Sequence, residues 1–246
     1  MKRLAIIIAR GGSKRIPRKN IKDFCGKPII AYSIEAAQSS GMFDEVMVST
    51  DDEEIAEIAR GYGAKVPFYR SEATSNDFAT ANDVLLEVID EYEKRGQVFD
   101  IGCCLFPTAP FIEADRIKTA IEMLEQSDAD TVMPVVAFSY PPQRALVMEE
   151  GRLVFKYPKY LDARSQDLEK QYHDAGQFFC FRVPNYKVNK KALVGNVLPL
   201  EISEMEVQDI DTQTDWEIAE MKWEILHTPH IGQFPNCPPL GSCTCF

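Results

Sequence analysis

Apolar and polar positions alternate with two different periods along the first half of the chain. Short runs of consecutive apolar residues are each followed by a segment whose apolar residues recur every three or four positions, as in amphipathic helices. The apolar runs predict strands at 4–9, 45–50, 66–69, 100–106 and 131–136. The periodic segments predict helices at 28–38, from 51 onward, at 80–95 and at 113–126. This alternation is typical of a mainly parallel β-sheet covered by helices, so we expect an α/β fold.

The alternation stops after Phe138. Residues 139–176 (the excursion) are polar, aromatic and proline-bearing, and no helical period runs through them. A segment of this length without regular helices inside a compact domain is usually functional or disordered. A strand at 177–183 and a helix at 213–226 follow it. We therefore expect one domain over residues 1–227 that carries the excursion as an insertion.

The last segment, residues 228–246, differs in kind from the rest. It contains four prolines and three cysteines, shows no apolar period and offers little to bury. We interpret it as a disordered or non-native tail, with adventitious metal binding as the alternative. It plays no part in the expected fold.

The charge and composition of the chain exclude several classes of protein. A formal net charge of −11 opposes binding to nucleic acid or to an anionic membrane across a broad surface. No run of about 18 consecutive apolar residues occurs, so no membrane-spanning helix is predicted. Seven cysteines without paired CxxC spacing argue against a zinc ribbon and a disulfide framework. Cys103 and Cys104 lie in an apolar run, where free cysteine behaves as a small buried hydrophobe, so we expect a cytoplasmic protein.

The first predicted strand is followed at once by a concentration of positive charge. Residues 10–20 (the basic loop) read Arg-Gly-Gly-Ser-Lys-Arg-Ile-Pro-Arg-Lys-Asn, with five basic residues and no acidic one. Gly11 and Gly12 allow the backbone to turn its N–H groups toward an anion, and Ser13 adds a hydroxyl. The loop is expected at the carboxyl end of a parallel strand, where open α/β sheets bind ligands. These features predict a polyphosphate site.

Three other interpretations explain the basic loop less well. A Walker A loop requires GxxxxGK[ST], which the sequence lacks, and the lysine spacing is wrong. A dinucleotide-binding fingerprint requires a third glycine that opens a helix, and none is present. A solvated surface turn remains the alternative, although such turns rarely combine two glycines with five cations directly after a buried strand.

Several short motifs resemble, in the same order, those of the CMP-sialic acid synthetase family of cytidylyltransferases. The first lie in and around the basic loop, at 9–14, 16–17 and 19–21. The others follow along the chain at 26–28, 49–52, 70–77, 107–110, 209–211 and 216. The likeness covers residues 1 to about 226. It implies a Rossmann-like nucleotidyltransferase fold, with helices on both faces of a mainly parallel sheet.

The resemblance implies a role for each matching residue at the nucleotide. The triphosphate would be held by the first part of the basic loop: Arg10, Gly11, Gly12, Ser13 and Lys14. Lys19 would lie nearest the reacting phosphate, and Asn20 near the ribose. The cytosine ring would be held by Arg70, Asp77 and Thr80, although some family members carry serine in place of Thr80.

A pair of carboxylates, Asp209 and Asp211, matches the residues that bind Mg²⁺ in the family. Two side chains at positions i and i+2 of an extended segment project to the same side. Mg²⁺ is usually held by one or two carboxylates together with substrate phosphates. The alternative is a capping turn before a helix that begins near Asp215. With the metal interpretation, the catalytic residues are expected to be Arg10, Lys19, Asp209 and Asp211.

Several residues depart from the pattern of the sialate-activating members. Arg15 and Arg18 stand where many sialate-activating members carry glycine, and Phe106 stands where they usually have glutamine. These departures look most like the pseudaminic acid branch, whose nine-carbon sugar is less polar. Arg144 would meet the sugar carboxylate, with Arg164 and Gln166 as a second polar clamp or as ordinary surface side chains. The expected sugar-side residues are Phe106, Thr108, Arg144, Arg164, Gln166, Gln177, Phe178 and Phe179.

The resemblance also implies a reaction and an assembly. The anomeric hydroxyl of an acidic nine-carbon sugar would attack the α-phosphorus of CTP, with Mg²⁺ as cofactor and pyrophosphate as the leaving group. The general base is not identified by the sequence, although Asp209 is one candidate. The family is generally dimeric, so we expect a homodimer in which Phe178, Phe179 or the segment before them closes the neighbour's sugar pocket.

Two other functions remain open at this point. One keeps the reaction and changes the sugar to sialic, legionaminic or 3-deoxy-octulosonic acid. The other is a binding module that senses CTP without catalysis, which the carboxylate pair and the long excursion disfavour. A P-loop kinase is a weaker third option, because its phosphate loop is missing.

Overall fold

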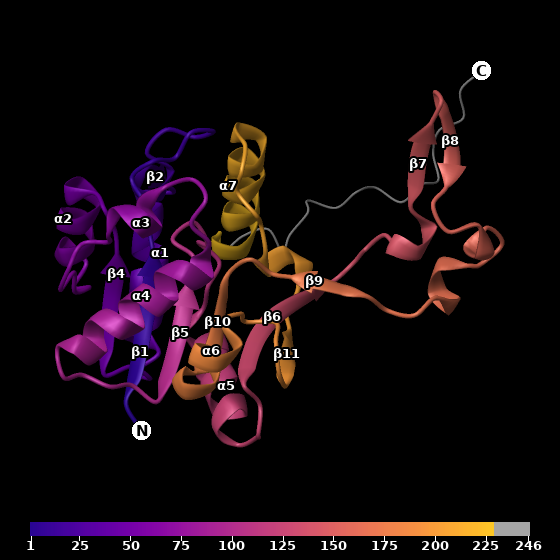
Figure 1. Ribbon diagram of the computed structural model, residues 1–246. Coiled ribbons are helices and arrows are strands. Elements are labelled where there is room, and N and C mark those ends of the chain that lie inside the picture. Colours follow the sequence, from indigo (N-terminus) through magenta and orange to yellow (C-terminus); the bar gives the residue numbers. More distant parts are fainter. Residues whose placement is uncertain (229–246) are drawn as a thin grey trace.

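The computed structural model describes residues 1–228, and its centre is a seven-stranded β-sheet (Figure 1). The strands are arranged in the order β11-β6-β10-β5-β1-β4, and β9 pairs with β6. Their bounds are β1 Arg3–Ile8, β4 Glu45–Ser49, β5 Ile101–Leu105, β6 Thr131–Ala137, β9 Tyr172–Asp174, β10 Phe178–Arg182 and β11 Val197–Glu201.

The sheet is mixed, with a parallel half built as the sequence predicts. Strand β1 runs parallel to both β4 and β5, and β11 runs parallel to β6. Strand β10 is antiparallel to its two neighbours, β5 and β6. Residues 4–7 of β1 and all of β5 are buried, which explains why these strands read as continuous apolar runs.

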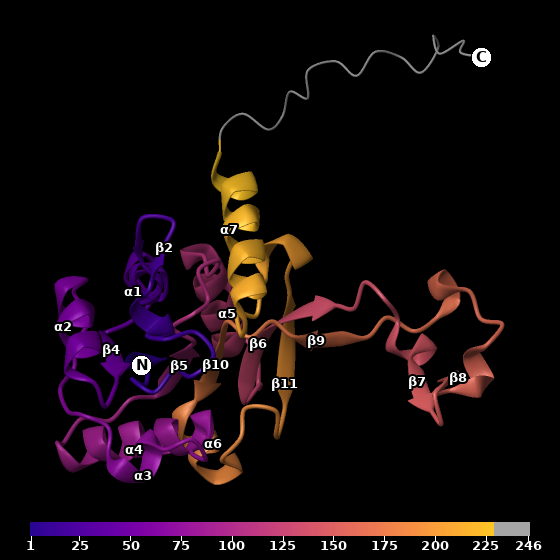
Figure 2. The same ribbon diagram turned by 90° about the horizontal axis from the view of Figure 1, so that it is seen from above.

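Helices cover both faces of the sheet and create two cores. Helices α1, α2 and α5 pack on one face through residues such as Ile34, Ile55 and Ile121. Helices α4 and α6 pack on the other face through Val88 and Tyr186 (Figure 2). The helix bounds are α1 Ile29–Ser39, α2 Glu53–Gly61, α3 Glu72–Ser75, α4 Ala81–Lys94, α5 Ala114–Glu125, α6 Val183–Asn189 and α7 Gln213–His227. The predicted α/β architecture is therefore confirmed.

The predicted strand at 66–69 is wrong. Only Lys65 pairs with the sheet edge, through backbone hydrogen bonds of 2.9 Å to Val46 and Val48. Pro67 has no N–H to continue the pairing. Outside the excursion, the helices and strands that were not predicted are α3, α6, β11 and a small hairpin of β2 (Asp23–Phe24) and β3 (Lys27–Pro28). Each is short or lacks a clear apolar period.

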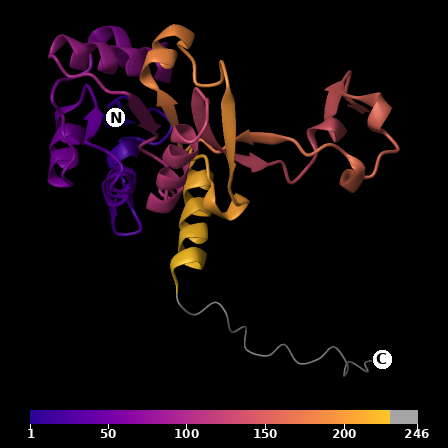
Figure 3. The same cartoon turned by 90° about the horizontal axis from the view of Figure 1, so that it is seen from below.

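The excursion leaves the sheet beyond β11, at the edge opposite β4, and projects from the body of the domain (Figures 1 and 3). Strands β6 and β9 form its base, and a hairpin of β7 (Leu146–Glu149) and β8 (Arg152–Phe155) lies in its outer part. The excursion has no α-helix, as expected, but it does have this hairpin. Short 3-10 helices occur here and elsewhere, at Lys19–Ile21, Pro142–Arg144, Pro158–Tyr160, Ser165–Asp167 and Glu204–Glu206.

Two predictions from composition can be compared with the structure. Cys25, Cys103, Cys104 and Cys180 are free, and all but Cys25 are buried. Within residues 1–228, none of the helices combines the length and apolarity needed to cross a membrane. The predicted tail, residues 228–246, lies outside the described residues apart from Thr228.

Candidate active site

The basic loop forms the wall of a cavity at the carboxyl ends of β1 and β5. The cavity has a volume of about 400 Å³. It is lined by Ile8, Arg10, Ser13, Lys14, Arg15, Ile16, Lys19, Asn20, Pro107 and Thr108. The loop follows β1, and Pro107 and Thr108 follow β5, so both walls come from the strand ends where α/β sheets bind ligands. The structure therefore brings together six of the predicted site residues: Arg10, Ser13, Lys14, Lys19, Asn20 and Thr108.

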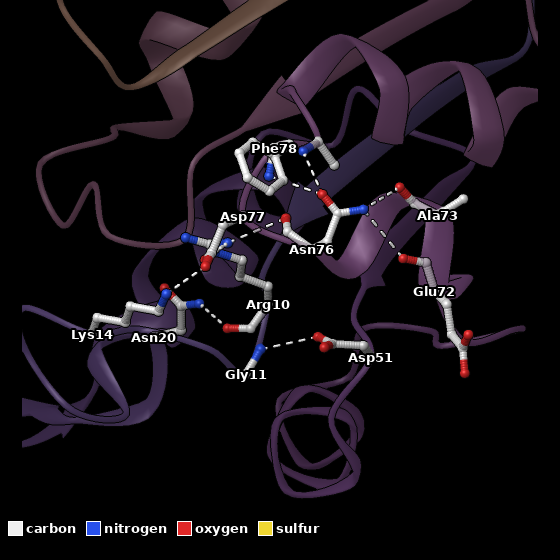
Figure 4. Close-up of polar contacts among 11 residues, drawn as sticks. Arg10, Gly11, Lys14, Asn20, Asp51, Glu72, Ala73, Asn76, Asp77 and Phe78 are labelled. Carbon is white, nitrogen blue, oxygen red and sulfur yellow. Dashed lines mark hydrogen bonds and ion pairs between the residues drawn. The ribbon is translucent and has the colours of Figure 1, made fainter.

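Asp77 pairs with two cations of the basic loop, as Figure 4 shows. An oxygen of its carboxylate accepts from Arg10 Nη1 at 2.9 Å, and the other accepts from Lys14 Nζ. The two cations hold the pKa of the Asp77 carboxyl below its usual value, Lys14 having the larger effect. Asn20 is buried and donates to the Arg10 carbonyl at 2.8 Å, which ties the end of the loop to its beginning.

The loop is fixed on its other side by the N-terminus of α2. The Gly11 N–H donates to Asp51 at 3.0 Å. A Cβ at Gly11 would lie 2.6 Å from a carboxylate oxygen of Asp52, so only glycine fits this close approach. Arg18 has a left-handed backbone conformation (φ 54°). Its guanidinium donates two hydrogen bonds to the Asp52 carboxylate, at 2.5 and 2.8 Å. Gly12 has nothing within 4 Å of an added Cβ, so its backbone faces open space.

A further carboxylate partner of the loop is Asp211. The Arg15 guanidinium contacts both of its oxygens at 2.8 Å. Lys19 Nζ lies 3.6 Å from the same carboxylate and donates to the Ile210 carbonyl at 2.5 Å. Lys19 is therefore held in a fixed position by the backbone just before Asp211, although the two residues are far apart in the sequence.

The carboxylates of Asp209 and Asp211 fit a divalent cation. Burial and the negative charge of Asp211 raise the pKa of Asp209, and Lys19 opposes this shift only in part. A cation beside the pair would relieve the repulsion between the two carboxylates. No group of three or more His, Cys, Asp or Glu residues with metal-binding geometry occurs among residues 1–228. Such a cation would therefore take its other ligands from phosphate or water.

The start of α7 argues against the alternative that Asp209 and Asp211 form a capping turn for this helix. Thr212 is the N-cap, and it forms a capping box with Asp215. Asp211 contributes only its backbone N–H, which donates to Asp215 at 3.1 Å. The side chains of Asp209 and Asp211 are thus not used to cap the helix.

All three residues expected at the cytosine ring have contacts with other residues of the chain. Arg70 is largely buried and donates to the Ser49 carbonyl at 2.7 Å, and burial lowers its pKa. Thr80 caps α4, and its hydroxyl donates to Asp83 at 2.7 Å. The third, Asp77, directs both oxygens to the basic loop. Contact of these side chains with a base remains a prediction.

Three of the expected sugar-side residues are buried in the body of the domain. Phe178 and Phe179 are 1% and 5% exposed, because β10 lies inside the sheet and its side chains alternate between the two cores. Gln177 is 3% exposed and donates to the Glu206 carbonyl at 2.5 Å. Their burial argues against the predicted contacts with a sugar, in this chain or in a neighbour. Phe106 is half-buried between the two cores.

The remaining sugar-side residues lie on the excursion. Arg144 donates to Ser165 at 3.2 Å, and Arg164 pairs with Asp167 at 2.7 Å. Gln166 lies between these partners, in the 3-10 helix Ser165–Asp167. The excursion projects from the sheet edge opposite β4, whereas the basic loop follows β1 (Figure 2). A contact between these side chains and a ligand in the cavity therefore requires a second chain.

Several residues at the site were missed by sequence reasoning. Asp51 and Asp52 were interpreted as the start of a helix and as part of a family motif, with no contact to the basic loop expected, yet both hold it. Arg15 and Arg18 were counted among the cations of the loop and noted as departures from the sialate pattern, but the acidic partner of each was not predicted. Charge balance could have predicted these acidic partners, because a loop with five cations needs nearby acids in a protein of net charge −11.

A mostly parallel sheet with a glycine-containing basic loop at its strand ends defines a nucleotide-binding enzyme of the nucleotidyltransferase class. The cytidylyltransferase family model matches residues 4–213, and the chain belongs to this family. It is 44% identical over 233 residues to a pseudaminic acid cytidylyltransferase of Campylobacter jejuni subsp. jejuni serotype O:2. The match covers 92% of this chain and 98% of that protein.

More distant relatives share the fold and most of the length. A CMP-N,N'-diacetyllegionaminic acid synthase of Legionella pneumophila is 33% identical, with 92% of this chain and 97% of that protein covered. The solved structure of a CMP:2-keto-3-deoxy-manno-octonic acid synthetase complexed with CTP superposes with a TM-score of 0.68. Its identity is 21%, and the match covers 92% of this chain and all of that one, so it shows the fold alone.

Proposed function

We propose that the chain transfers CMP from CTP to the anomeric hydroxyl of pseudaminic acid and releases pyrophosphate. The observation that carries this proposal is the cavity between the basic loop and the residues that follow β5, together with Asp211, which contacts Arg15 and Lys19 of that loop. The choice of sugar rests on the relative that is 44% identical. It also rests on Phe106, an apolar side chain where sialate enzymes usually have glutamine.

The protein's contribution to the reaction is positioning and charge. Arg10, Ser13 and Lys14 would hold the β- and γ-phosphates, and Lys19 would lie against the phosphate that reacts. The anomeric oxygen forms a bond to the α-phosphorus while the bond to the bridging oxygen breaks, and the hydroxyl proton leaves to a base. Fixed cations then take up the charge that moves onto pyrophosphate, which is the main source of such rate enhancements.

Mg²⁺ is the proposed metal, because it is usually held by one or two carboxylates together with substrate phosphates. Asp209 and Asp211 would hold it, and it would neutralise phosphate charge when bound. Arg15 and Lys19 would then exchange part of their contact with Asp211 for contacts with phosphate oxygens.

Product formation from a panel of sugars tests this proposal. The chain is incubated with CTP and Mg²⁺ together with pseudaminic, legionaminic, sialic or 3-deoxy-octulosonic acid, and pyrophosphate and the CMP-sugar are measured. We expect pseudaminic acid to give by far the highest kcat/KM. A preference for another sugar would contradict the substrate assignment. CTP binding without any CMP-sugar product would favour the non-catalytic binding module.

The homodimer remains part of the proposal, with the excursion as its contact. Seven of its large apolar side chains are at least 40% exposed, and exposed apolar side chains gathered in one segment favour an interaction surface. They are Tyr140, Leu146, Met148, Leu153, Tyr157, Leu161 and Tyr172. A second chain would cover them and would also bring Arg144, Arg164 and Gln166 to its partner's cavity.

Leu153→Asp is expected to convert the dimer to a monomer and to raise the KM for the sugar more than the KM for CTP. Leu153 is 68% exposed and lies opposite Met148 in the β7–β8 hairpin, so a charge there disrupts only an intermolecular contact. Light scattering measures the mass. Val188→Asp is the control, because Val188 is 79% exposed on α6, outside the excursion. A wild-type chain that is monomeric and fully active would refute the dimer.

A further inference from the structure

Asp77 is an acidic residue in direct contact with the basic loop. Both of its oxygens are used by cations of the basic loop, one by Arg10 and the other by Lys14. These are the same two side chains that the proposed function assigns to the triphosphate. A carboxylate in this position is a negative charge in direct contact with the cations that a second anion must use.

The turn that carries Asp77 is built to hold it there. The Asn76 side chain accepts from the N–H groups of Phe78 at 2.8 Å and Ala79 at 3.1 Å (Figure 4). Its amide donates to the Ala73 carbonyl at 2.8 Å, which joins the turn to the end of α3. The Thr80 capping box then starts α4 immediately after the turn. Arg10 also reaches the turn, donating to the Asn76 carbonyl at 3.3 Å.

We propose that Asp77 is an internal anion that competes with the nucleotide's phosphates for Arg10 and Lys14. This inference rests on the proposed function, because it assumes that the basic loop binds a triphosphate. Asp77 then lowers the affinity for every polyphosphate, including the pyrophosphate product. The advantage is faster turnover. As pyrophosphate leaves, the carboxylate pairs again with Arg10 and Lys14, and this speeds the release of a tightly held anion.

The proposal differs from the role that family resemblance implies for Asp77. A carboxylate that binds the cytosine ring contributes to CTP affinity and has no effect on pyrophosphate, which carries no base. A competing carboxylate weakens both ligands. The two roles therefore predict opposite changes for CTP when the charge is removed.

The test is calorimetric titration of the wild type and three variants with pyrophosphate and with CTP. In Asp77→Asn we expect pyrophosphate to bind about three- to tenfold more tightly, since each exposed ion pair is weak. CTP is expected to bind more tightly too, and inhibition of turnover by pyrophosphate to strengthen by the same factor. Asp77→Glu keeps the charge and should stay within about twofold of the wild type.

Glu72→Gln is the matched control for overall charge. Glu72 lies in α3, near the same turn, and its carboxylate has no ion pair within residues 1–228. It should leave both affinities unchanged. Weaker CTP binding with unchanged pyrophosphate binding in Asp77→Asn would overturn the inference and restore the cytosine role. A wild-type chain that binds neither ligand would overturn the proposed function and this inference together.

Discussion

Lys19→Ala is expected to lower kcat by about 10²–10³-fold, with a much smaller change in the KM for CTP. The Lys19 side chain is only 18% exposed, and the Ile210 carbonyl holds its ammonium group at 2.5 Å. A charge fixed in this way needs no rearrangement as the reaction proceeds, so it stabilises the transition state more than it stabilises bound CTP. The measurement is steady-state kinetics with saturating sugar.

Lys22→Ala is the matched control for Lys19. Lys22 belongs to the same stretch of chain and also reaches toward α7, where it contacts Gln213 at 3.2 Å and lies over the Trp216 ring. It does not line the cavity, so we expect its loss to change kcat by less than about threefold. Near-normal kcat in purified, folded Lys19→Ala would refute the assigned role.

Asp211→Ala is expected to reduce turnover by at least about 100-fold. This side chain is the common partner of Arg15 and Lys19 and one of the two carboxylates that would hold Mg²⁺. Its removal leaves Asp209 as the sole carboxylate of the pair and frees two cations to contact phosphate. We therefore expect the Mg²⁺ concentration at half-maximal rate to rise, whereas the affinity for CTP without metal should increase or stay the same.

Glu217→Gln provides the control for Asp211. Glu217 is an exposed acid on α7, and its carboxylate accepts a hydrogen bond from the Gln213 side chain at 3.3 Å. Its loss should leave both the rate and the Mg²⁺ dependence unchanged. The melting temperature of Asp211→Ala should also remain close to that of the wild type, because Thr212 and Asp215 cap α7 without the Asp211 side chain. Unchanged Mg²⁺ dependence in Asp211→Ala would contradict the metal assignment.

The parallel half of the fold could be predicted from the sequence because its signals are local. The strand at Arg3–Ile8 reads as an apolar run since both faces of the sheet are covered there. The basic loop was identified for a similar reason, as its glycines and cations are contiguous. The elements that were missed, such as β11, are short, and their position depends on what packs beside them.

The sugar side could not be predicted in the same way. Phe178 and Phe179 follow the excursion closely in the sequence. However, β10 lies between β5 and β6 in the sheet, and both rings are therefore buried in the cores. The sequence does not reveal this antiparallel insertion. Likewise, the acids that pair with the basic loop come from positions 34 to 196 residues away, and only the fold brings them together.

The central claim is that the basic loop binds the three linked phosphates of CTP. Hydrogen–deuterium exchange of residues 10–20, with and without CTP and Mg²⁺, tests it most directly. The account predicts that CTP slows exchange of the backbone amides of Gly11, Gly12 and Ser13, and that a Lys14→Ala, Lys19→Ala double variant loses most of this protection. Exchange that CTP leaves unchanged, or protection that survives the loss of both lysines, would contradict the claim.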